Sequence, residues 1–522
     1  MDTARSTLGS KPSGFRPSPR HALCALILLL SLSALYITTC RLIAQTHMHR
    51  AGDLFREGHY GLALTHFEKA SHSLPGDYTI QKELGKTYSK LAGLQPGTRE
   101  KLSLIRQAQE HYLEAFRLNP LDAETAYALA RGEERLEELT RRLHPEKKDT
   151  EYDALPYFRE AIRLRPNGIT YRYALARYLY RHGEQLELTL VAKTLARVYP
   201  HSCWYLRKEA FWSPAIAEAC KVGLREAIDA KISVREAHEN MSYLLAEEKK
   251  WDGAIFHYAE AMRHNSINTG AGDYIKLGRL YLKNGQIEAA EVNFLKGLDI
   301  STEREGDLER LYGIYKGEGR FDELYRFYKK AGSRYVGSSR MDILLARSLI
   351  DLKQYNRARR ILEEINLKES TAEAYYWLAH IAGKEKDRDS MELAIQKATV
   401  LDPSNSLYHL IFSQVLKRRN KLERAEREAT LAIGHQTRPS AGLYNHRAWI
   451  RWSTRDYAGA LRDWKSAIAL KPDRASFYAQ AAEACIKIGD LSRAMEYYQR
   501  AVDLEPGNEG YGKRYKALKA GS

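Results

Sequence analysis

Few of the residue patterns that carry enzymatic chemistry occur in this chain. Two glycine pairs, beginning at Gly270 and Gly317, lack the third glycine and the preceding strand of a dinucleotide site. His238-Glu239 lacks the second histidine of a zinc-protease motif, and the sequence contains no G-x-x-x-x-G-K-S/T phosphate loop. We therefore predict no catalytic residues and expect that the protein is not an enzyme.

Metal and cofactor sites are also weakly indicated. The five cysteines form no C-x-x-C pair, which argues against a zinc ribbon or a redox motif; they are Cys24, Cys40, Cys203, Cys220 and Cys485. Cys203 and Cys220 could pair in an oxidising compartment, but two buried thiols are the favoured state. His47-x-His49 offers only two ligands on a linker, so we expect neither a metal nor a cofactor.

Composition is that of a folded, basic protein. The chain has 522 residues, more than a single core usually supports, and only 15 prolines, which suits long helices. Its net charge of +16 favours anionic partners. The sequence contains no dense Lys/Arg block, however, so the excess charge is expected to be spread over many solvated helix faces.

The N-terminal region has the order of a membrane anchor. A basic tail at 1–20 precedes an apolar run from Ala22 to about Thr39, and about 18 residues is the short end of what spans a bilayer. We predict a transmembrane signal-anchor at 21–40, with a cleaved signal peptide or a lipoprotein cysteine at Cys40 as alternatives. The basic tail predicts a cytoplasmic N terminus and an extracytoplasmic body, periplasmic in a Gram-negative cell.

A period of about 34 residues runs through the rest of the chain. In each period a small or apolar residue is followed four positions later by a bulky or apolar one, and often by alanine three positions further on. Positions i, i+4 and i+7 share one helix face, so a partner helix can approach closely there. The first positions are Ala63, Ala108, Ala154, Leu188, Ala254, Ala290, Leu324, Ala358, Met391, Ala425, Ala460 and Ala494. Prolines that close these helices are Pro75, Pro120, Pro166, Pro200, Pro403, Pro472 and Pro506.

A second motif, Leu-Gly-x-x-Tyr, precedes this helix at 84–88 and 277–281, and a turn such as Asn284-Gly285 joins the two. The combined pattern resembles the tetratricopeptide repeat, most clearly at 274–298. The resemblance implies an all-α fold, a right-handed α-solenoid of about twelve helical hairpins preceded by one transmembrane helix.

The repeats also predict a domain organisation. The predicted segments are a basic disordered tail at 1–20, the signal-anchor at 21–40, a block of four repeats at 45–201, a degenerate helical pair or hinge at 202–234, a block of eight repeats at 235–506 and a capping helix at 507–522. The second and third repeats carry insertions at 91–103 and 139–152, which we interpret as longer turns or lengthened helices.

Family resemblance implies that ligands lie in a concave groove lined by the first helix of each repeat. The residues at the matching positions are cationic or aromatic, a mixture suited to acidic peptides, sugars or other anionic chains. Besides Tyr173, they are Arg177, Tyr180, Tyr243, Arg279, Lys283, Arg347, Tyr376, His380, Lys384, Gln414, Lys417, Arg418, Trp449 and Trp452. For Trp449 and Trp452, packing on the neighbouring repeat is the alternative to ligand contact.

These features predict a membrane-anchored scaffold for protein–protein interactions, acting in cell-envelope assembly, secretion or surface-polysaccharide production. Two alternatives stay open, an anionic-polymer binder that uses the basic groove and an organelle-surface import receptor. Export of the repeats disfavours nucleic acid but leaves anionic polysaccharide open as a partner.

Overall fold

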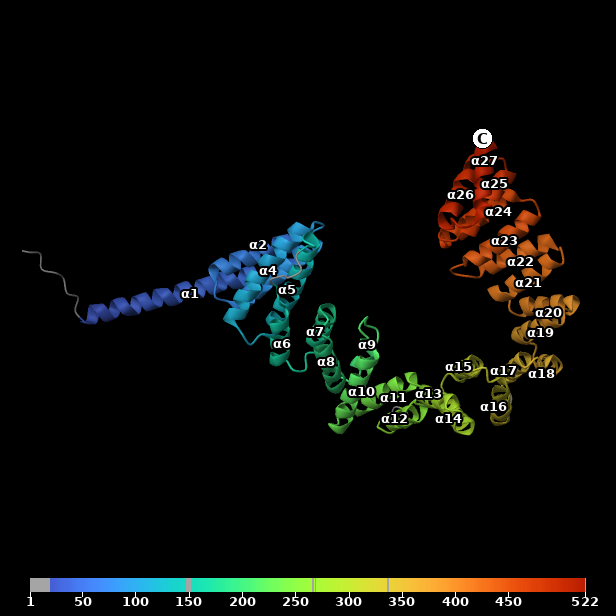
Figure 1. Cartoon of the computed structure of the whole chain (residues 1–522), viewed down its shortest axis with the longest axis horizontal. Helices are drawn as coiled ribbons and strands as arrows, with labels where there is room; N and C mark the ends of the chain where they lie inside the picture. The colour runs from blue at the N-terminus through green and yellow to red at the C-terminus, as the bar shows by residue number, and fades with distance from the viewer. Residues whose placement is uncertain (1–18, 147–151, 265–266, 268, 336–337, 522) are drawn as a thin grey trace, which may run out of the picture. The chain divides into compact units, whose positions relative to one another are not determined.

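The computed structural model describes residues 19–146, 152–264, 267, 269–335 and 338–521, so most of the expected N-terminal tail lies outside the described residues. The described chain forms 27 helices and no strand, which confirms the all-α prediction (Figure 1). It divides into two compact units, Met1–Ser266 (unit 1) and Ile267–Ser522 (unit 2).

The helices of unit 1 are α1 (Pro19–Arg56), α2 (Tyr60–Ser73), α3 (Tyr78–Leu94), α4 (Thr98–Leu118), α5 (Ala123–Leu143), α6 (Leu155–Leu164), α7 (Ile169–His182), α8 (Gln185–Val198), α9 (Ser202–Leu206), α10 (Pro214–Asp229), α11 (Val234–Glu247) and α12 (Trp251–Arg263). Those of unit 2 are α13 (Ala271–Lys283), α14 (Ile287–Ile300), α15 (Arg304–Gly317), α16 (Phe321–Arg334), α17 (Ser339–Asp351), α18 (Tyr355–Lys368), α19 (Ala372–Glu385), α20 (Arg388–Leu401), α21 (Ser406–Arg418), α22 (Leu422–Gly434), α23 (Ala441–Ser453), α24 (Tyr457–Leu470), α25 (Ala475–Lys487), α26 (Leu491–Leu504) and α27 (Glu509–Gly521).

Consecutive helices pair as hairpins, and the predicted repeat positions form their cores. Ala63, Phe67 and Ala70 of α2 are all buried, as are the corresponding residues of most second helices. Met391 of α20 is an exception, because it is only partly buried against its neighbours. Each predicted proline lies two residues beyond the end of a helix, as Pro472 does after α24.

The glycine of the Leu-Gly-x-x-Tyr motif is required by close packing. A Cβ atom on Gly278 of α13 would lie 2.5 Å from the ring of Phe294 in α14 and 3.1 Å from the carbonyl oxygen of Ala290. Gly85 of α3 faces Tyr112 of α4 in the same way, at 2.8 Å. The motif therefore marks the place where the aromatic side chain of the second helix lies flat against the first helix.

The two insertions lengthen helices. Residues 91–94 end α3 and residues 98–103 begin α4, which has 21 residues. Residues 139–143 extend α5, also to 21 residues, while 147–151 lie outside the described residues. The first insertion therefore adds helical turns, whereas the second adds helix only as far as Leu143, and the described residues 144–146 and 152–154 that follow it are not helical.

The segment 202–234 holds the 5-residue α9 and the 16-residue α10, which packs against α8. Cys203 of α9 and Cys220 of α10 are buried free thiols. A hydrogen bond to Cys203, together with burial, raises the pKa of Cys220 well above its usual value. The expectation of two buried thiols is confirmed.

Polar side chains link the two helices of several hairpins at equivalent positions. In α11/α12 the Nδ1 atoms of His238 and His257 lie 2.8 Å apart, and in α1/α2 those of His47 and His66 lie 3.1 Å apart; the partners are 19 positions apart in the sequence in both cases. One ring nitrogen must donate and the other accept, so both imidazoles cannot be charged without breaking the bond. Burial, helped by His238, lowers the pKa of His257 to about 4.

The packing at Gly278 predicts that Gly278→Ala destabilises the α13/α14 hairpin, because overpacking of this kind costs about 1–3 kcal/mol. Amide hydrogen exchange of the full chain should show faster exchange across α13 and α14. Gly313→Ala in α15 is the matched control, since its added Cβ meets nothing within 4 Å, and it should exchange as slowly as the unaltered chain or more slowly. Equal exchange in the two variants would contradict the packing argument.

The histidine pair predicts an acid-sensitive hairpin. The folded pKa of His257 lies below the unfolded value of about 6.5, so its contribution is present above pH 6.5 and is lost as the pH falls toward 4. The melting temperature should fall between pH 7 and pH 5, and His257→Gln, which keeps a hydrogen-bonding side chain without this titration, should reduce the fall. An unchanged pH dependence in the variant would show that the pair does not titrate as inferred.

Candidate functional site

The predicted groove residues all lie on first helices of hairpins. Arg177 and Tyr180 belong to α7 and Tyr243 to α11, and the others belong to α13, α17, α19, α21 and α23. First helices of neighbouring hairpins contact each other within a unit, as α15 does with α17 and α17 with α19. The positional rule therefore selects side chains that share one face of the array in each unit.

In unit 1 this face combines ion pairs with exposed aromatic rings. Arg177 pairs with Glu209 at 2.5 Å, and the ring of Tyr180, 45% exposed, lies 5.7 Å from that of Phe211. Tyr243, 38% exposed, carries the guanidinium of Arg207 over its ring at 4.5 Å. Arg177 is therefore already paired, and Arg207 covers one face of Tyr243, whereas the ring of Tyr180 stays partly exposed.

Tyr173, also on α7, differs from these residues. Its hydroxyl donates a hydrogen bond of 2.8 Å to the carbonyl oxygen of Ser202, and its ring meets Tyr205 edge-on. The side chain thus joins α7 to α9, which is a structural contact between neighbouring helices.

The first predicted residues of unit 2 lie on α13. Lys283 pairs with Glu318, which follows α15, at 2.6 Å, whereas Arg279 is exposed. The ion pair links successive first helices across the face.

Arg347 of α17 is the centre of the face in unit 2. Its guanidinium carbon lies 4.1 Å from the centroid of the Tyr312 ring and 4.9 Å from that of Trp377, so it stacks between aromatic groups of α15 and α19. One terminal nitrogen also donates to Glu309. Its Nε atom is buried and has no hydrogen-bond partner among the described residues.

His380 and its neighbours on α19 extend this centre. Burial, with the nearby charge of Lys384, lowers the pKa of His380, and its buried Nδ1 has no hydrogen-bond partner in the described part of the chain. Tyr376 packs against Trp377 and against Tyr408 of α21. Buried polar atoms without a hydrogen-bond partner in the described residues therefore lie beside the partly exposed rings of Tyr376 and Trp377.

On α21 the predicted residues differ in exposure. Burial lowers the pKa of Lys417, which lies near His446, and burial together with that lysine lowers the pKa of His446 to about 4. Gln414 is half-buried and Arg418 is exposed. At neutral pH His446 is therefore uncharged and accepts or donates a 2.9 Å hydrogen bond with Ser413.

Trp449 and Trp452 of α23 pack within their own hairpin and also line a pocket. Their rings pack against Trp464 of the following helix, with centroid separations of 5.5 and 5.8 Å. They also line a pocket of about 370 Å³ that α25, α26 and α27 complete. The pocket contains Gln480, Glu483, Tyr498 and Tyr511, none of which the repeat positions selected.

The residues that sequence reasoning missed are mainly the partners of the predicted ones. Tyr312 and Trp377 enclose Arg347, and Glu209 and Glu318 neutralise predicted basic residues. Trp377 directly follows the selected Tyr376, so an aromatic residue beside a groove position was a usable signal. The acidic partners gave no such signal, because they occupy neighbouring repeats.

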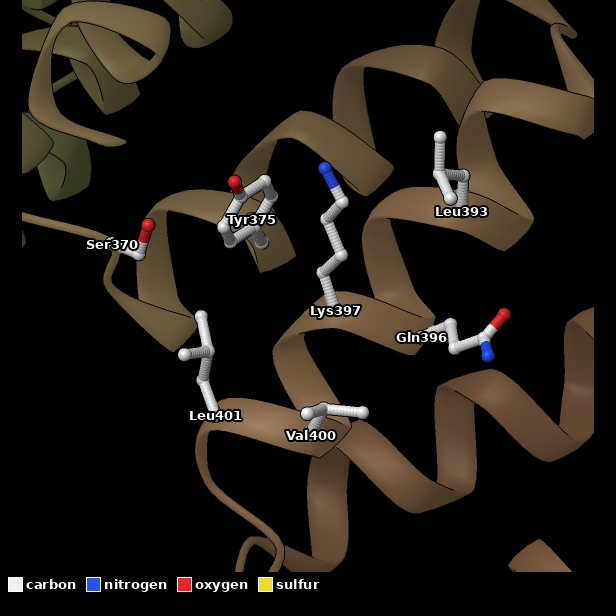
Figure 2. A pocket seen from close by; sticks show the side chains of 7 residues that line it. All are labelled: Ser370, Tyr375, Leu393, Gln396, Lys397, Val400 and Leu401. Carbon is white, nitrogen blue, oxygen red and sulfur yellow. The ribbon is translucent and has the colours of Figure 1, made fainter. Parts of the chain in front are cut away.

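A separate apolar pocket of about 310 Å³ lies between the start of α19 and α20 (Figure 2). Tyr375 comes from α19, and Lys397 of α20 reaches over its ring at 5.1 Å. Leu393 and Val400, also of α20, are 58% and 72% exposed. None of the predicted residues lines this pocket, which is formed largely by a second helix.

The described residues contain no group of three or more His, Cys, Asp or Glu side chains placed to hold a metal ion.

Comparison with known proteins identifies the repeat. The family model described as tetratricopeptide repeat matches residues 274–303, 372–405 and 446–509. The chain is 26% identical over 205 residues to the human protein O-mannosyl-transferase TMTC1, covering 38% of this chain and 23% of that protein. It is 35% identical over 68 residues to the Hsp70-Hsp90 organizing protein of Triticum aestivum, covering 13% and 12%. This chain therefore spans less than a quarter of either relative.

Among solved structures, yeast Tom70 resembles the chain with a TM-score of 0.33 and 15% identity, over 91% of this chain and 96% of Tom70.

Proposed function

We propose that this protein, whose helical hairpins are tetratricopeptide repeats, is a membrane-tethered scaffold that binds other proteins along the face of its first helices. Tetratricopeptide repeats bind proteins or peptides, and the matched segments lie in unit 2. The observation that supports this role best is the row of partly exposed rings and unfilled polar atoms on α17 and α19.

Ion pairs on this face favour a protein partner over a uniform polyanion. Lys283 faces Glu318, Arg177 faces Glu209, and Arg347 faces Glu309. Each carboxylate cancels part of the positive field that would attract a polyanion. A folded protein or peptide with groups of both signs matches such a face better than an anionic polysaccharide or a nucleic acid does.

The membrane tether rests on α1. This helix includes the segment Leu26–Arg56 near the N terminus, which is long and apolar enough to cross a membrane. A stretch of 18 residues in this segment has a mean hydropathy of 2.0, and none of it is buried in the structure. Leu28, Leu29 and Leu30 are 60–65% exposed, an arrangement that is costly in water and favourable in lipid. The apolar run of about 18 residues would rise about 27 Å, close to the thickness of the hydrocarbon layer.

We place the basic tail in the cytoplasm and the repeats on the other side of the membrane, following the distribution of basic residues before the run. This orientation suits a role in cell-envelope assembly, secretion or surface-polysaccharide production. No residue is assigned to catalysis in this proposal.

Membrane insertion predicts that Leu29→Arg combined with Leu32→Arg moves the protein out of the membrane fraction. A charged side chain near the bilayer centre costs about 2.5–3.5 kcal/mol, so two should abolish stable insertion. Extraction of membranes with alkaline carbonate measures the change, and Leu29→Ile with Leu32→Ile should stay membrane-bound. If the arginine variant resisted extraction as well as the control, α1 would not be the anchor.

The binding face predicts where partners can be captured. A benzoylphenylalanine that replaces Tyr180, on first helix α7, should give discrete crosslinks to other proteins in membranes of the producing cells. The same residue in place of Phe256, which is 57% exposed on second helix α12, is the matched control and should give few. Equal capture at both positions would show that the first-helix face is not the binding face.

A further inference from the structure

We propose that the pocket between α23 and α27, called here the tryptophan pocket, binds the ammonium group of a lysine side chain on a partner protein. It is defined by Trp449, Trp452, Gln480, Glu483 and Tyr498. The inference rests on the proposed scaffold function and specifies one contact that a partner makes with it.

The aromatic walls form a corner. The rings of Trp449 and Trp452 meet at 72° with their centroids 6.3 Å apart, and Trp449 meets Trp464 at 84°. Two rings set nearly at right angles can each turn a negative face toward one small cation in the corner between them, whereas a sugar ring stacks best on an open, flat platform. The geometry therefore favours a compact cation.

Two polar groups in the pocket, the amide oxygen of Gln480 and the carboxylate of Glu483, are acceptors. The Oε1 atom of Gln480 is buried and has no hydrogen-bond partner within the described residues. Glu483 accepts a 2.5 Å hydrogen bond from the hydroxyl of Tyr498. A buried acceptor without a donor is unfavourable, and an ammonium group carries three donors and no acceptor. An apolar ligand would leave Gln480 unfilled, and a carboxylate would be repelled by Glu483.

The chain already brings a cation to this carboxylate. Arg514 of α27 places its Nε 3.4 Å from an oxygen of Glu483, and the arginine side chain is 66% exposed. The contact is long and solvent-exposed, so it is easily displaced. Arg514 thus acts as an internal competitor for the site that a lysine of the partner would occupy.

The test uses the full-length protein in detergent and Nα-acetyl-lysine methylamide as the probe. NMR spectra of ¹⁵N-labelled indole groups, assigned with Trp449→Phe and Trp452→Phe, report occupancy of the pocket. We expect saturable shifts of both indole signals, and binding of the uncharged analogue Nα-acetyl-norleucine methylamide about tenfold weaker because it lacks the cation. Equal binding of the two probes, or stronger binding of methyl glucoside, would overturn the assignment.

Two variants separate the pocket from general effects. Glu483→Gln should weaken the lysine probe severalfold, while Arg514→Ala should strengthen it because the competitor is removed. Arg493→Ala is the matched control for Arg514, since Arg493 is an exposed arginine paired with Asp490, and it should change nothing. If neither Glu483→Gln nor Arg514→Ala altered binding, the carboxylate would not be part of the site.

Failure of this proposal can be told apart from failure of the scaffold function. Crosslinking at Tyr180 reports the first-helix face of unit 1 and does not depend on the tryptophan pocket. Loss of probe binding with crosslinks intact would reject the pocket alone.

Discussion

Close approach of two helices at a small side chain is the contact on which the rest of the structure depends. Ala63, Ala254 and Ala460 are fully buried in their second helices, and a bulky side chain one turn later fills the space beside each. Where the small residue becomes Leu188, the following position becomes Ala192, so the combined volume is kept. In hairpin α15/α16 a smaller residue does not compensate for a larger one, because Leu324 and Tyr328 are both large. Tyr315 of α15 and Phe327 of α16 form a cluster of rings there with Phe294 of α14.

This contact explains what could be predicted from sequence. Residues at i, i+4 and i+7 lie within two helical turns, so a short stretch of sequence shows which residues of each second helix form the core. The all-α fold could be predicted from this pattern. Ion pairs on the first-helix face join residues such as Arg347 and Glu309, 38 positions apart. Their pairing depends on how one hairpin stacks on the next, which no local period encodes. For the same reason, the sequence predicted only part of the lining of the tryptophan pocket. Trp449 and Trp452 occupy groove positions, but Gln480 and Glu483 belong to the next hairpin.

The N-terminal helix shows that hydropathy and backbone structure need not change together. Apolar residues give way to polar ones near Cys40, yet α1 continues to Arg56, and no glycine or proline interrupts it between Cys40 and Ala51. Ala44 and Ala51 are buried against α2, so the last turns of α1 serve as the first helix of the first hairpin. If α1 spans a membrane, the first repeat is therefore fixed to the membrane segment without a flexible linker. Any tilt of the spanning helix would be passed directly to α2, because the same helix takes part in both contacts.

The tryptophan pocket differs from the surroundings of Arg347 in how its polar groups are matched. An internal first helix is flanked by first helices on both sides, so its ring and acid side chains find partners, as Arg347 does between Tyr312 and Trp377. Helix α27, which follows α26, adds Tyr511 to the pocket and brings Arg514 to Glu483. Acceptors on α25 are then left incompletely matched, and a pocket with an unfilled amide oxygen remains. A protein with a net charge of +16 can in this way hold a local site for a cation, because recognition at short range depends on the few groups in contact rather than on the total charge.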